Sequence, residues 1–289
     1  MNFNIFSKFH PLVNFIFFLT VIVSVVTIQH PLYIVTSLTA GICYYILLDG
    51  KKGAKKALAL LPVSIIIATI NPLFNRYGEH ILFHIFNRPY TLEALLYGLT
   101  LGGIFIDTII WFACYSRVLT GDKFTALFGR LIPSLSLILV MIFQMIPNFT
   151  KKAKQIILSR KSIGKGINSG STFKEKVRDG ATIISIMTDW SLENSIIIAD
   201  SMKARGYGSK KRTNYNDYTF TKKDAILLST IIILLITLFF SANTRADFTP
   251  KISIEPFSLG IIIYGILTFI PTIIEIKETI VWHILKSKI

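Results

Sequence analysis

The chain has 289 residues, of which 52% are apolar and only 16% are charged, and its mean hydropathy is +0.58. This composition excludes an ordinary soluble domain and predicts an all-α integral membrane protein. Lysine and arginine number 31 against 16 acidic residues, which gives a formal net charge of +15. Basic residues of short loops stay on the cytoplasmic side, so their positions predict the orientation.

The longest charge-free run lies near the N-terminus and covers residues 9–48. A helix needs about 20 mostly apolar residues to cross about 30 Å of hydrocarbon, so this run predicts two spans joined by a short turn at His30 and Pro31. No small-residue cleavage site follows the first apolar run, which is therefore interpreted as a retained span. Single spans are predicted at residues 57–75, 94–116, 225–242 and 256–274.

The predicted span at residues 94–116 contains Asp107, an acidic residue where hydrocarbon is expected. Such a residue is a functional candidate by default, although Asp107 could equally hydrogen-bond to a neighbouring helix or reach water. Small residues at Gly98, Gly102 and Gly103 of the same span are typical of close helix packing.

Basic residues set the predicted orientation. Lys8 precedes the first span and the lysines of residues 51–56 follow the second, so both flanks are predicted to be cytoplasmic. Residues 148–223 carry 16 Lys and Arg against 6 Asp and Glu, which is +10 of the chain's +15. That segment is therefore also expected in the cytoplasm. The lysines at positions 277, 286 and 288 agree with about six spans and two cytoplasmic termini.

Residues 131–150 form one more uncharged run, and they complicate this topology. A single crossing there would place residues 148–223 outside. Either the run is a buried or interfacial helix along the cytoplasmic face, or the chain crosses again within residues 181–199. Asp189 and Glu193 make a second crossing costly, which favours the interfacial helix. A conventional seventh span stays open as the alternative.

A helical pattern with a glycine stop occurs late in the cytoplasmic segment. Apolar residues between Ile183 and Met202 recur with a period near 3.6 residues. Gly206 readily takes the left-handed conformation that closes a helix, so the helix is expected to end at Ala204, Arg205 and Gly206. Taken alone, Arg205 could be a basic residue that simply suits the negative end of the helix dipole.

A second arginine occupies a similar position upstream. Residues 153–164 run through an apolar helical pattern to Ser159, Arg160 and Lys161 and then reach Gly164. Residues 165–172 are rich in glycine and serine and are predicted to be a flexible connection. The segment is thus expected to present arginine at two helix ends.

Residues 200–207, Asp-Ser-Met-Lys-Ala-Arg-Gly-Tyr, resemble the second of two Ala-Arg-Gly signatures in the T component of energy-coupling factor (ECF) transporters, a family that includes cobalt-transport membrane subunits. The first signature is matched only at Arg160, because Ser159 and Lys161 replace its alanine and glycine; Gly164 is then expected to supply the turn. The resemblance extends over nearly the whole chain. Weaker matches are His10-Pro11, residues 71–74 and residues 91–93.

The resemblance implies a non-catalytic subunit of an importer in a prokaryotic cell membrane. A T component couples two cytosolic ABC ATPases, which hydrolyse ATP, to a small membrane protein, the S component, which binds a micronutrient such as a vitamin or a metal ion. Arginine suits an ATPase dock because its planar, permanently charged guanidinium makes paired hydrogen bonds to carboxylates or carbonyls. The implied docking residues are Ser159, Arg160 and Lys161 for one ATPase and Ala204, Arg205 and Gly206 for the other.

The resemblance also implies how the chain is divided. Residues 1–130 would form N-terminal transmembrane helices, residues 131–223 a cytoplasmic region of coupling helices, and residues 224–289 a C-terminal transmembrane pair. The apolar residues 131–146 and the apolar face of residues 183–202 would pack against the S component, although packing against the chain's own spans explains them equally well.

The main alternative is a membrane enzyme that acts on a lipid or isoprenoid phosphate at the cytoplasmic face. The sequence lacks the Asp-x-Asp runs and the glycine-rich phosphate loop that such chemistry uses. A secondary transporter would show two similar halves, which the unequal spans do not. Cys43 and Cys114 form no redox or metal motif, and His80 and His84 have no third ligand nearby. We therefore expect no catalytic residue, no cofactor, no metal site and no nucleic-acid module.

Overall fold

The computed structural model describes residues 5–75, 78, 80–85, 88–128, 133–164, 172–208, 218–241, 246–247, 253–254 and 258–286. The chain divides into two compact units. Met1–Lys123 and Tyr218–Ile289 form the first, here named the membrane unit, and Phe124–Asp217 form the second, here named the arginine unit.

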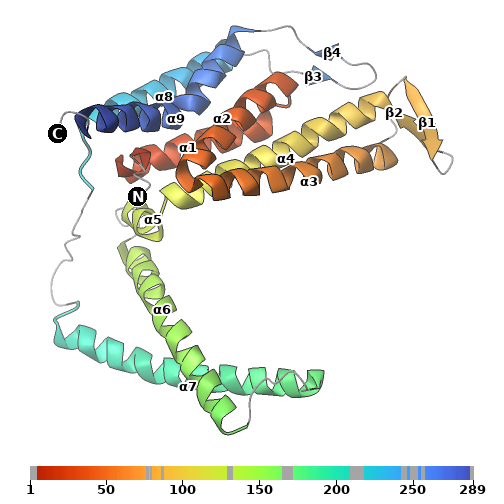
Figure 1. Ribbon diagram of the computed structural model, residues 1–289. Helices are drawn as coiled ribbons and strands as arrows, with labels where there is room; N and C mark the ends of the chain where they lie inside the picture. Colours follow the sequence, from red (N-terminus) through yellow and green to blue (C-terminus); the bar gives the residue numbers. More distant parts are fainter. Residues whose placement is uncertain are drawn as a thin grey trace. The chain divides into compact units, whose positions relative to one another are not determined.

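Helices make up most of the membrane unit (Figure 1). Five of them, α2, α3, α4, α8 and α9, are long and apolar enough to cross a membrane, and α1 is a shorter apolar helix. They lie where the six spans were predicted, so the chain is an all-α, multi-pass membrane protein. The elements are η1 (Phe6–Lys8), α1 (Pro11–Thr27), α2 (Pro31–Asp49), α3 (Lys51–Phe74), β1 (Ile81–Ile85), β2 (Arg88–Thr91), α4 (Leu92–Val118), the start of α5 (Gly121–Phe128), α8 (Lys222–Ser241), β3 (Ala246–Asp247), β4 (Ser253–Ile254) and α9 (Leu259–Lys286).

The first two helices begin with the same histidine-proline pair. Pro11 and Pro31 stand in the first turns of α1 and α2, where a missing backbone N–H costs nothing. His10 accepts a hydrogen bond from the Leu12 N–H and His30 from the Leu32 N–H, at 3.2 and 3.3 Å. The predicted break at His30 and Pro31 is therefore confirmed, and its physical cause is an N-cap.

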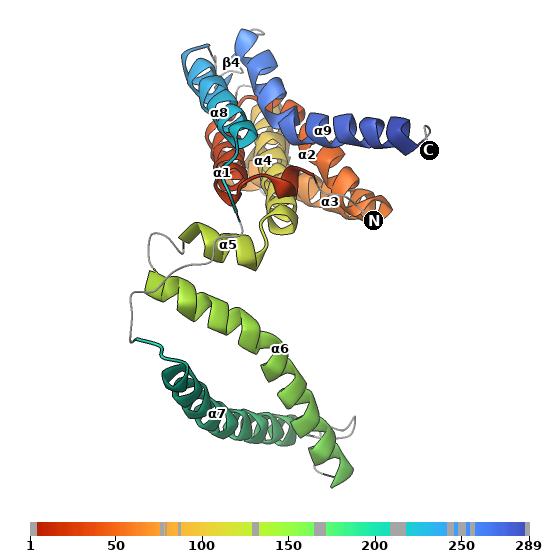
Figure 2. The same cartoon turned by 90° about the vertical axis from the view of Figure 1, so that its left-hand side faces the viewer.

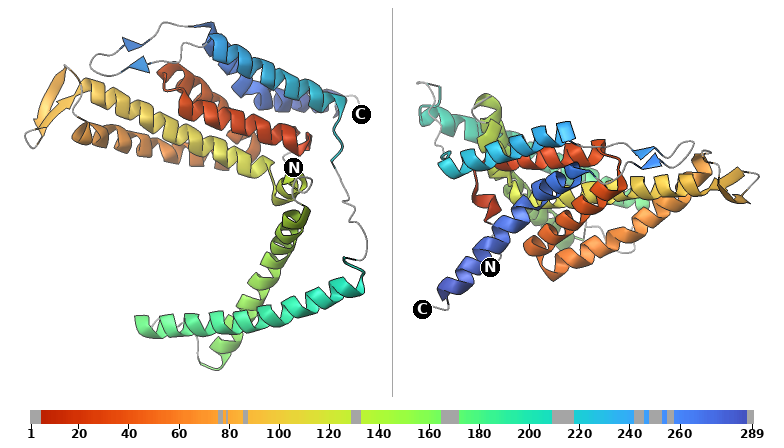
Figure 3. Two further views of the ribbon diagram at one scale, coloured as in Figure 1. Left: turned by 180° about the vertical axis from the view of Figure 1, so that it is seen from behind. Right: turned by 90° about the horizontal axis from the view of Figure 1, so that it is seen from above.

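The buried core of the membrane unit joins α1, α2, α4 and α9, and Figure 3 shows these helices from two further directions. Trp111 of α4 is fully buried and packs edge-on against Phe17 and Phe18 of α1, with ring centroids 6.1 and 6.3 Å apart. Its indole N–H donates to the Ser37 hydroxyl of α2 at 2.9 Å. One aromatic residue thus ties three helices together.

Glycines bring α3 and α4 into close contact, and the two helices lie side by side in Figure 1. A Cβ added at Gly102 would stand 2.9 Å from the backbone oxygen of Ser64, and one at Gly98 would stand 3.0 Å from that of Ala68. These distances leave no room for a side chain. The close packing predicted for Gly98 and Gly102 is confirmed, whereas Gly103 faces the Ile34 side chain of α2.

The segment between α3 and α4, which the sequence presents as a loop with two histidines, contains an antiparallel hairpin of β1 and β2. His84 lies in β1 and His80 precedes it, so they do not share a helix face. The His80 backbone N–H donates to Glu93 Oε1 of α4 at 3.1 Å. The hairpin is thereby fixed to the first turn of α4.

The arginine unit contains two long helices, α6 (Pro133–Ser162) and α7 (Phe173–Ala204), in addition to the end of α5. The uncharged run at residues 131–150 enters α6 and continues without a break into its basic half. α6 is not among the five helices that qualify as spans in the described ranges, and its relation to the membrane stays a prediction. The flexible connection predicted at residues 165–172 lies, except for its last residue, outside the described residues.

Candidate coupling site

Arg205 is the C-cap residue of α7, and the two residues after it close the helix. The Gly206 N–H donates to the Lys203 carbonyl at 2.9 Å, and the Tyr207 N–H donates to the Met202 carbonyl at 3.0 Å. These are the two hydrogen bonds of a Schellman motif, which requires a left-handed residue at the position of Gly206. Gly206 has a φ of +81°, so the predicted glycine stop is confirmed.

The Arg205 side chain is exposed, together with Ala204, Gly206 and Tyr207. Within the described residues it forms no ion pair with a carboxylate. A basic side chain at a helix C-terminus gains about 0.3–1 kcal/mol from the helix dipole, which does not use the five hydrogen-bond donors of the guanidinium. The donors of Arg205 are therefore available to another molecule.

Arg160 lies in a different environment, although the family resemblance implies the same role for both arginines. Its Nη2 donates to Asp179 Oδ1 of α7 at 2.7 Å, and the two side chains are only 15% and 22% exposed. Its Nε is buried and has no hydrogen-bond partner in the described part of the chain. Ser159 and Lys161 on either side are exposed. Arg160 thus joins α6 to α7 and keeps one donor unused.

Arg160 lies in the last turn of α6, as expected from the sequence, and the helix ends at Ser162. The turn follows at Gly164, which has a φ of +73° and whose N–H donates to the Lys161 carbonyl at 3.1 Å. Gly164 therefore supplies the turn that the sequence assigned to it. The two arginine motifs are built differently, since Arg205 caps a helix and Arg160 lies within one.

A second contact between α6 and α7 shows that the helices run in opposite directions (Figure 2). The Phe149 ring packs edge-on against Trp190 at 5.3 Å, and the Lys152 ammonium lies 5.7 Å from the same ring. From this contact to the ion pair of Arg160 and Asp179, the residue numbers increase along α6 and decrease along α7. At 1.5 Å per residue, Asp179 and Arg205 are roughly 40 Å apart along α7. The two arginines thus belong to separate sites.

The predicted apolar face of α7 is only partly buried. Ile183, Met187, Trp190 and Ile198 of that face are half-buried, whereas Ile184 and Ile197 of the same face are exposed. No residue of α7 is fully buried. Within residues 183–202 of α7, four large apolar residues are more than half exposed: Ile184, Leu192, Ile196 and Ile197. We name this group the α7 apolar strip. A helix with such a strip is suited to contact another apolar surface.

Asp107 of α4 is fully buried, so its carboxylate does not reach water. Ser37 and Trp111 lie beside it but hydrogen-bond to each other. Neither carboxylate oxygen has a well-aligned partner among the described residues. An ionised carboxylate is costly in such a place, and we infer that Asp107 holds a proton.

Replacing Asp107 by asparagine should therefore be tolerated. The amide has the same shape and is neutral, so we expect the Asp107→Asn protein to melt in detergent within about 4 °C of the wild type, which corresponds to roughly 1 kcal/mol in a protein of this size. Asp107→Ala serves as the comparison, because it leaves a cavity. If the melting temperature of the asparagine variant falls as far as that of the alanine variant, the carboxylic acid itself is required for stability.

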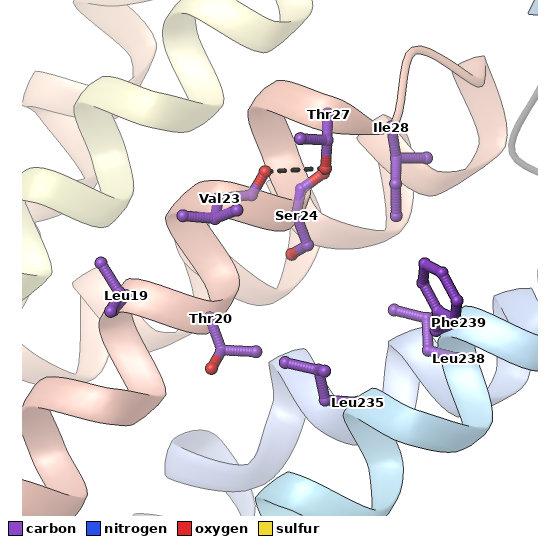
Figure 4. Close-up of a pocket in the computed structure, with 9 residues that line it drawn as sticks. All are labelled: Leu19, Thr20, Val23, Ser24, Thr27, Ile28, Leu235, Leu238 and Phe239. Atoms are coloured by element: carbon purple, nitrogen blue, oxygen red, sulfur yellow. Dashed lines mark hydrogen bonds between the residues drawn. The ribbon is translucent and has the colours of Figure 1, made fainter.

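Figure 4 shows an apolar pocket of about 520 Å³ between α1 and α8. Two of its hydroxyl groups bind to their own helix: the Thr27 Oγ1 donates to the Val23 carbonyl and the Ser24 Oγ to the Val21 carbonyl, both at 2.8 Å. The wall is therefore suited to hydrocarbon and has no titratable group. The lining residues are Leu19, Thr20, Val23, Ser24, Thr27, Ile28, Leu235, Leu238 and Phe239.

Comparison with known families places the chain in one of them. The family model CbiQ, described as cobalt transport protein, matches residues 6–215. The match includes α1 to α7 and both arginine motifs. No curated protein matches the chain.

Proposed function

Because the chain belongs to the CbiQ family of cobalt transport proteins, which are T components of ECF transporters, we propose that it transmits the motion of two cytosolic ABC ATPases to a small substrate-binding membrane protein. The chain is thus a membrane component of a transport system, and ATP is hydrolysed on its partners. The substrate class is a vitamin or a metal ion taken up across a prokaryotic cell membrane. Residues 131–223 act as the coupling region, with both termini in the cytoplasm.

The observation that carries this proposal is the exposed Arg205 at a glycine-closed helix end. Its backbone is fixed by the Schellman motif, so the guanidinium starts from a rigid position. Ala204 and Gly206 are small, which lets another surface approach the arginine closely. A planar guanidinium on a rigid helix end can make two parallel hydrogen bonds to a carboxylate or to paired carbonyls of an ATPase. Arg205 is therefore the stronger of the two docks.

Arg160 is the second dock, and it is already engaged by Asp179. An ATPase that binds Arg160 must either use the remaining donors of the guanidinium or displace Asp179. The exposed Ser159 and Lys161 flank the arginine and would form the edge of this contact. Asp179 is absent from the sequence-based site because its partner lies 19 positions earlier in the chain and only the pairing of α6 with α7 brings them together.

The α7 apolar strip supports a membrane-embedded partner for the same unit. Ile184 and Ile196 are 68% and 63% exposed, which is far more than a helix packed only against its own chain would show. A small S component offers an apolar helical surface of the kind that would cover them. Movement of the arginine unit that the ATPases drive would then be transmitted directly to the S component.

The experiment is affinity purification of the tagged chain in mild detergent from cells that contain its own transport operon. We expect two ABC ATPase subunits and one small membrane protein to be recovered with it. Recovery of the chain without ATPases under conditions that preserve its fold would contradict the proposal. The same preparation is the basis of the assays below.

The Asp179→Asn variant tests whether Arg160 contacts an ATPase or only holds α6 against α7. The substitution weakens the charge pair but leaves the arginine in place, so we expect ATPase recovery to stay within about twofold of the wild type. Arg160→Ala removes the dock and is expected to lower recovery at least tenfold, as for an interface arginine worth about 1.4 kcal/mol or more. Equal losses in both variants would show that Arg160 acts only by holding α6 to α7.

A further inference from the structure

The N-terminal residues 6–10 bind three of the buried charged residues of the membrane unit. Among Asp, Glu, Lys and Arg, five ionisable side chains are buried in the described part of the chain: Glu93, Asp107, Lys123, Asp224 and Glu275. The last three of these hydrogen-bond to residues 6–10. We name residues 6–10 the N-terminal anchor.

Lys123 of α5 makes the first of these contacts. Its ammonium donates to the Ser7 carbonyl, to the Ser7 hydroxyl at 2.7 Å and to the Val118 carbonyl at the end of α4 at 3.0 Å. All three donors of the lysine are thereby used. Burial lowers the pKa of Lys123 to about 8, so the side chain is still mostly charged at neutral pH. The lysine fixes the start of α5 to the anchor.

Asp224 makes the second contact, at the start of α8. Its Oδ1 accepts from the His10 N–H at 2.9 Å. Its Oδ2 accepts from the backbone N–H and the hydroxyl of Thr221, at 2.8 and 2.6 Å. The His10 ring also packs edge-on against Phe220, with centroids 5.3 Å apart. The segment that leads into α8 is therefore held by the anchor at two neighbouring positions.

Glu275 of α9 and the aromatic core hold the anchor itself in place. The Phe6 N–H donates to Glu275 Oε1 at 3.1 Å. The Phe6 ring is fully buried and packs edge-on against Phe17, Phe18 and Tyr44, with centroids 5.2 to 6.2 Å apart. The anchor is thus fixed to the centre of the helix bundle.

These contacts lie where the chain leaves the membrane unit and where it returns to it. Lys123 is the last residue of the membrane unit before the arginine unit, and Tyr218 is the first residue after it. The two described ends at which the membrane unit leads to the arginine unit, Lys123 and Phe220 to Asp224, are therefore both tied to the same five residues. We propose that the N-terminal anchor holds both of these ends, so that a displacement that reaches them moves α4, α8 and α9 instead of bending the chain at Lys123 and at Phe220 to Asp224.

The physical reason is that a displacement is absorbed wherever the chain is least constrained. A chain segment without such contacts bends by changing its backbone dihedral angles, as a hinge does, and the helix bundle does not move. A connection held by buried, charge-assisted hydrogen bonds resists that change, because breaking them leaves charged groups unpaired away from water. The inference rests on the proposed coupling function, in which the arginine unit is the part that ATPases move. Lys123 and Asp224 are thus positioning residues.

The test combines Lys123→Met and Asp224→Asn. The first keeps an unbranched side chain without donors, and the second replaces the carboxylate by an uncharged amide, which weakens the charge-assisted hydrogen bonds with His10 and Thr221. Lys52→Met, an exposed lysine of α3, is the matched control. The double variant is compared with the control by amide hydrogen exchange of residues 5–12 in detergent, by recovery of the transporter complex, and by uptake per ATP hydrolysed in vesicles.

We expect exchange in residues 5–12 to rise at least tenfold, recovery of the complex to stay within twofold, and uptake per ATP to fall at least fivefold. Unchanged exchange, or faster exchange with unchanged uptake per ATP, would overturn the proposal. Where the double variant does not fold, Ser7→Ala with Asp224→Asn replaces it under the same criteria. Failure to recover ATPases with the control protein would contradict the proposed function instead, while the exchange measurement would still decide whether these residues hold the anchor.

Discussion

Arg205→Ala is expected to abolish ATP-dependent uptake and to release at least one ATPase subunit from the chain, while the protein stays folded in the membrane. Arg205 is exposed and makes no ion pair within the described residues, so its loss breaks no internal contact of that kind. Truncating a central interface arginine costs about 2 kcal/mol or more, which corresponds to roughly 30-fold weaker binding. The measurement is ATPase recovery in mild detergent together with uptake in vesicles.

Lys203→Ala is the matched control for Arg205→Ala. Lys203 is an exposed basic residue in the same last turn of α7, so its loss removes the same charge without touching the cap. We expect recovery within about twofold of the wild type for this control. Arg205→Lys should lie between the two, because it keeps the charge and loses the paired hydrogen bonds. Equal ATPase recovery from Arg205→Ala and Lys203→Ala would rule out a specific dock at this helix end.

Gly102→Val is expected to be the most destabilising of the substitutions considered. A single Cβ at Gly102 already comes within 2.9 to 3.1 Å of the backbone oxygen, Cα and Cβ of Ser64, and valine adds two further methyl groups. Overpacking of this kind costs about 1–3 kcal/mol, and more where backbone must move. In a protein of this size we expect the melting temperature in detergent to fall by about 5–10 °C.

Gly265→Ala is the control for this prediction, because a Cβ there meets its nearest neighbour, the Thr36 side chain, at an ordinary 3.4 Å. We expect it to melt within about 2 °C of the wild type, and Gly102→Ala to lie between the control and the valine variant. A Gly102→Val protein that melts with the control would show that α3 and α4 are not held at the distance described.

Patterns that are local in the sequence predicted local structure correctly. The spans follow from charge-free runs, since each must bury or expose to lipid about 20 apolar residues. The end of α7 follows from Gly206, because a left-handed residue is needed there and glycine takes that conformation without strain. The turn after Arg160 follows from Gly164 for the same reason. The family resemblance at residues 200–207 rests on the same short pattern and agrees with the match over residues 6–215.

Contacts between distant parts of the chain could not be predicted in this way. Nothing in the neighbourhood of Arg160 indicates that Asp179 engages it, and nothing near Lys123 points to Ser7, which is 116 residues away. In each case the partner is chosen by how the helices pack, and a hydrophobic pattern does not encode that choice.

A multi-pass helical membrane protein, the ends of its helices and the two arginine motifs can be predicted from the sequence, because composition, period and glycine conformation act within a few residues. The difference between the two arginines follows from tertiary packing, since Arg205 is exposed at a helix end while Arg160 is paired with Asp179. Tertiary packing alone brought Lys123, Asp224 and Glu275 to one N-terminal segment. The reason is that buried charges must find partners inside the folded protein, and those partners become neighbours only after the helices have packed.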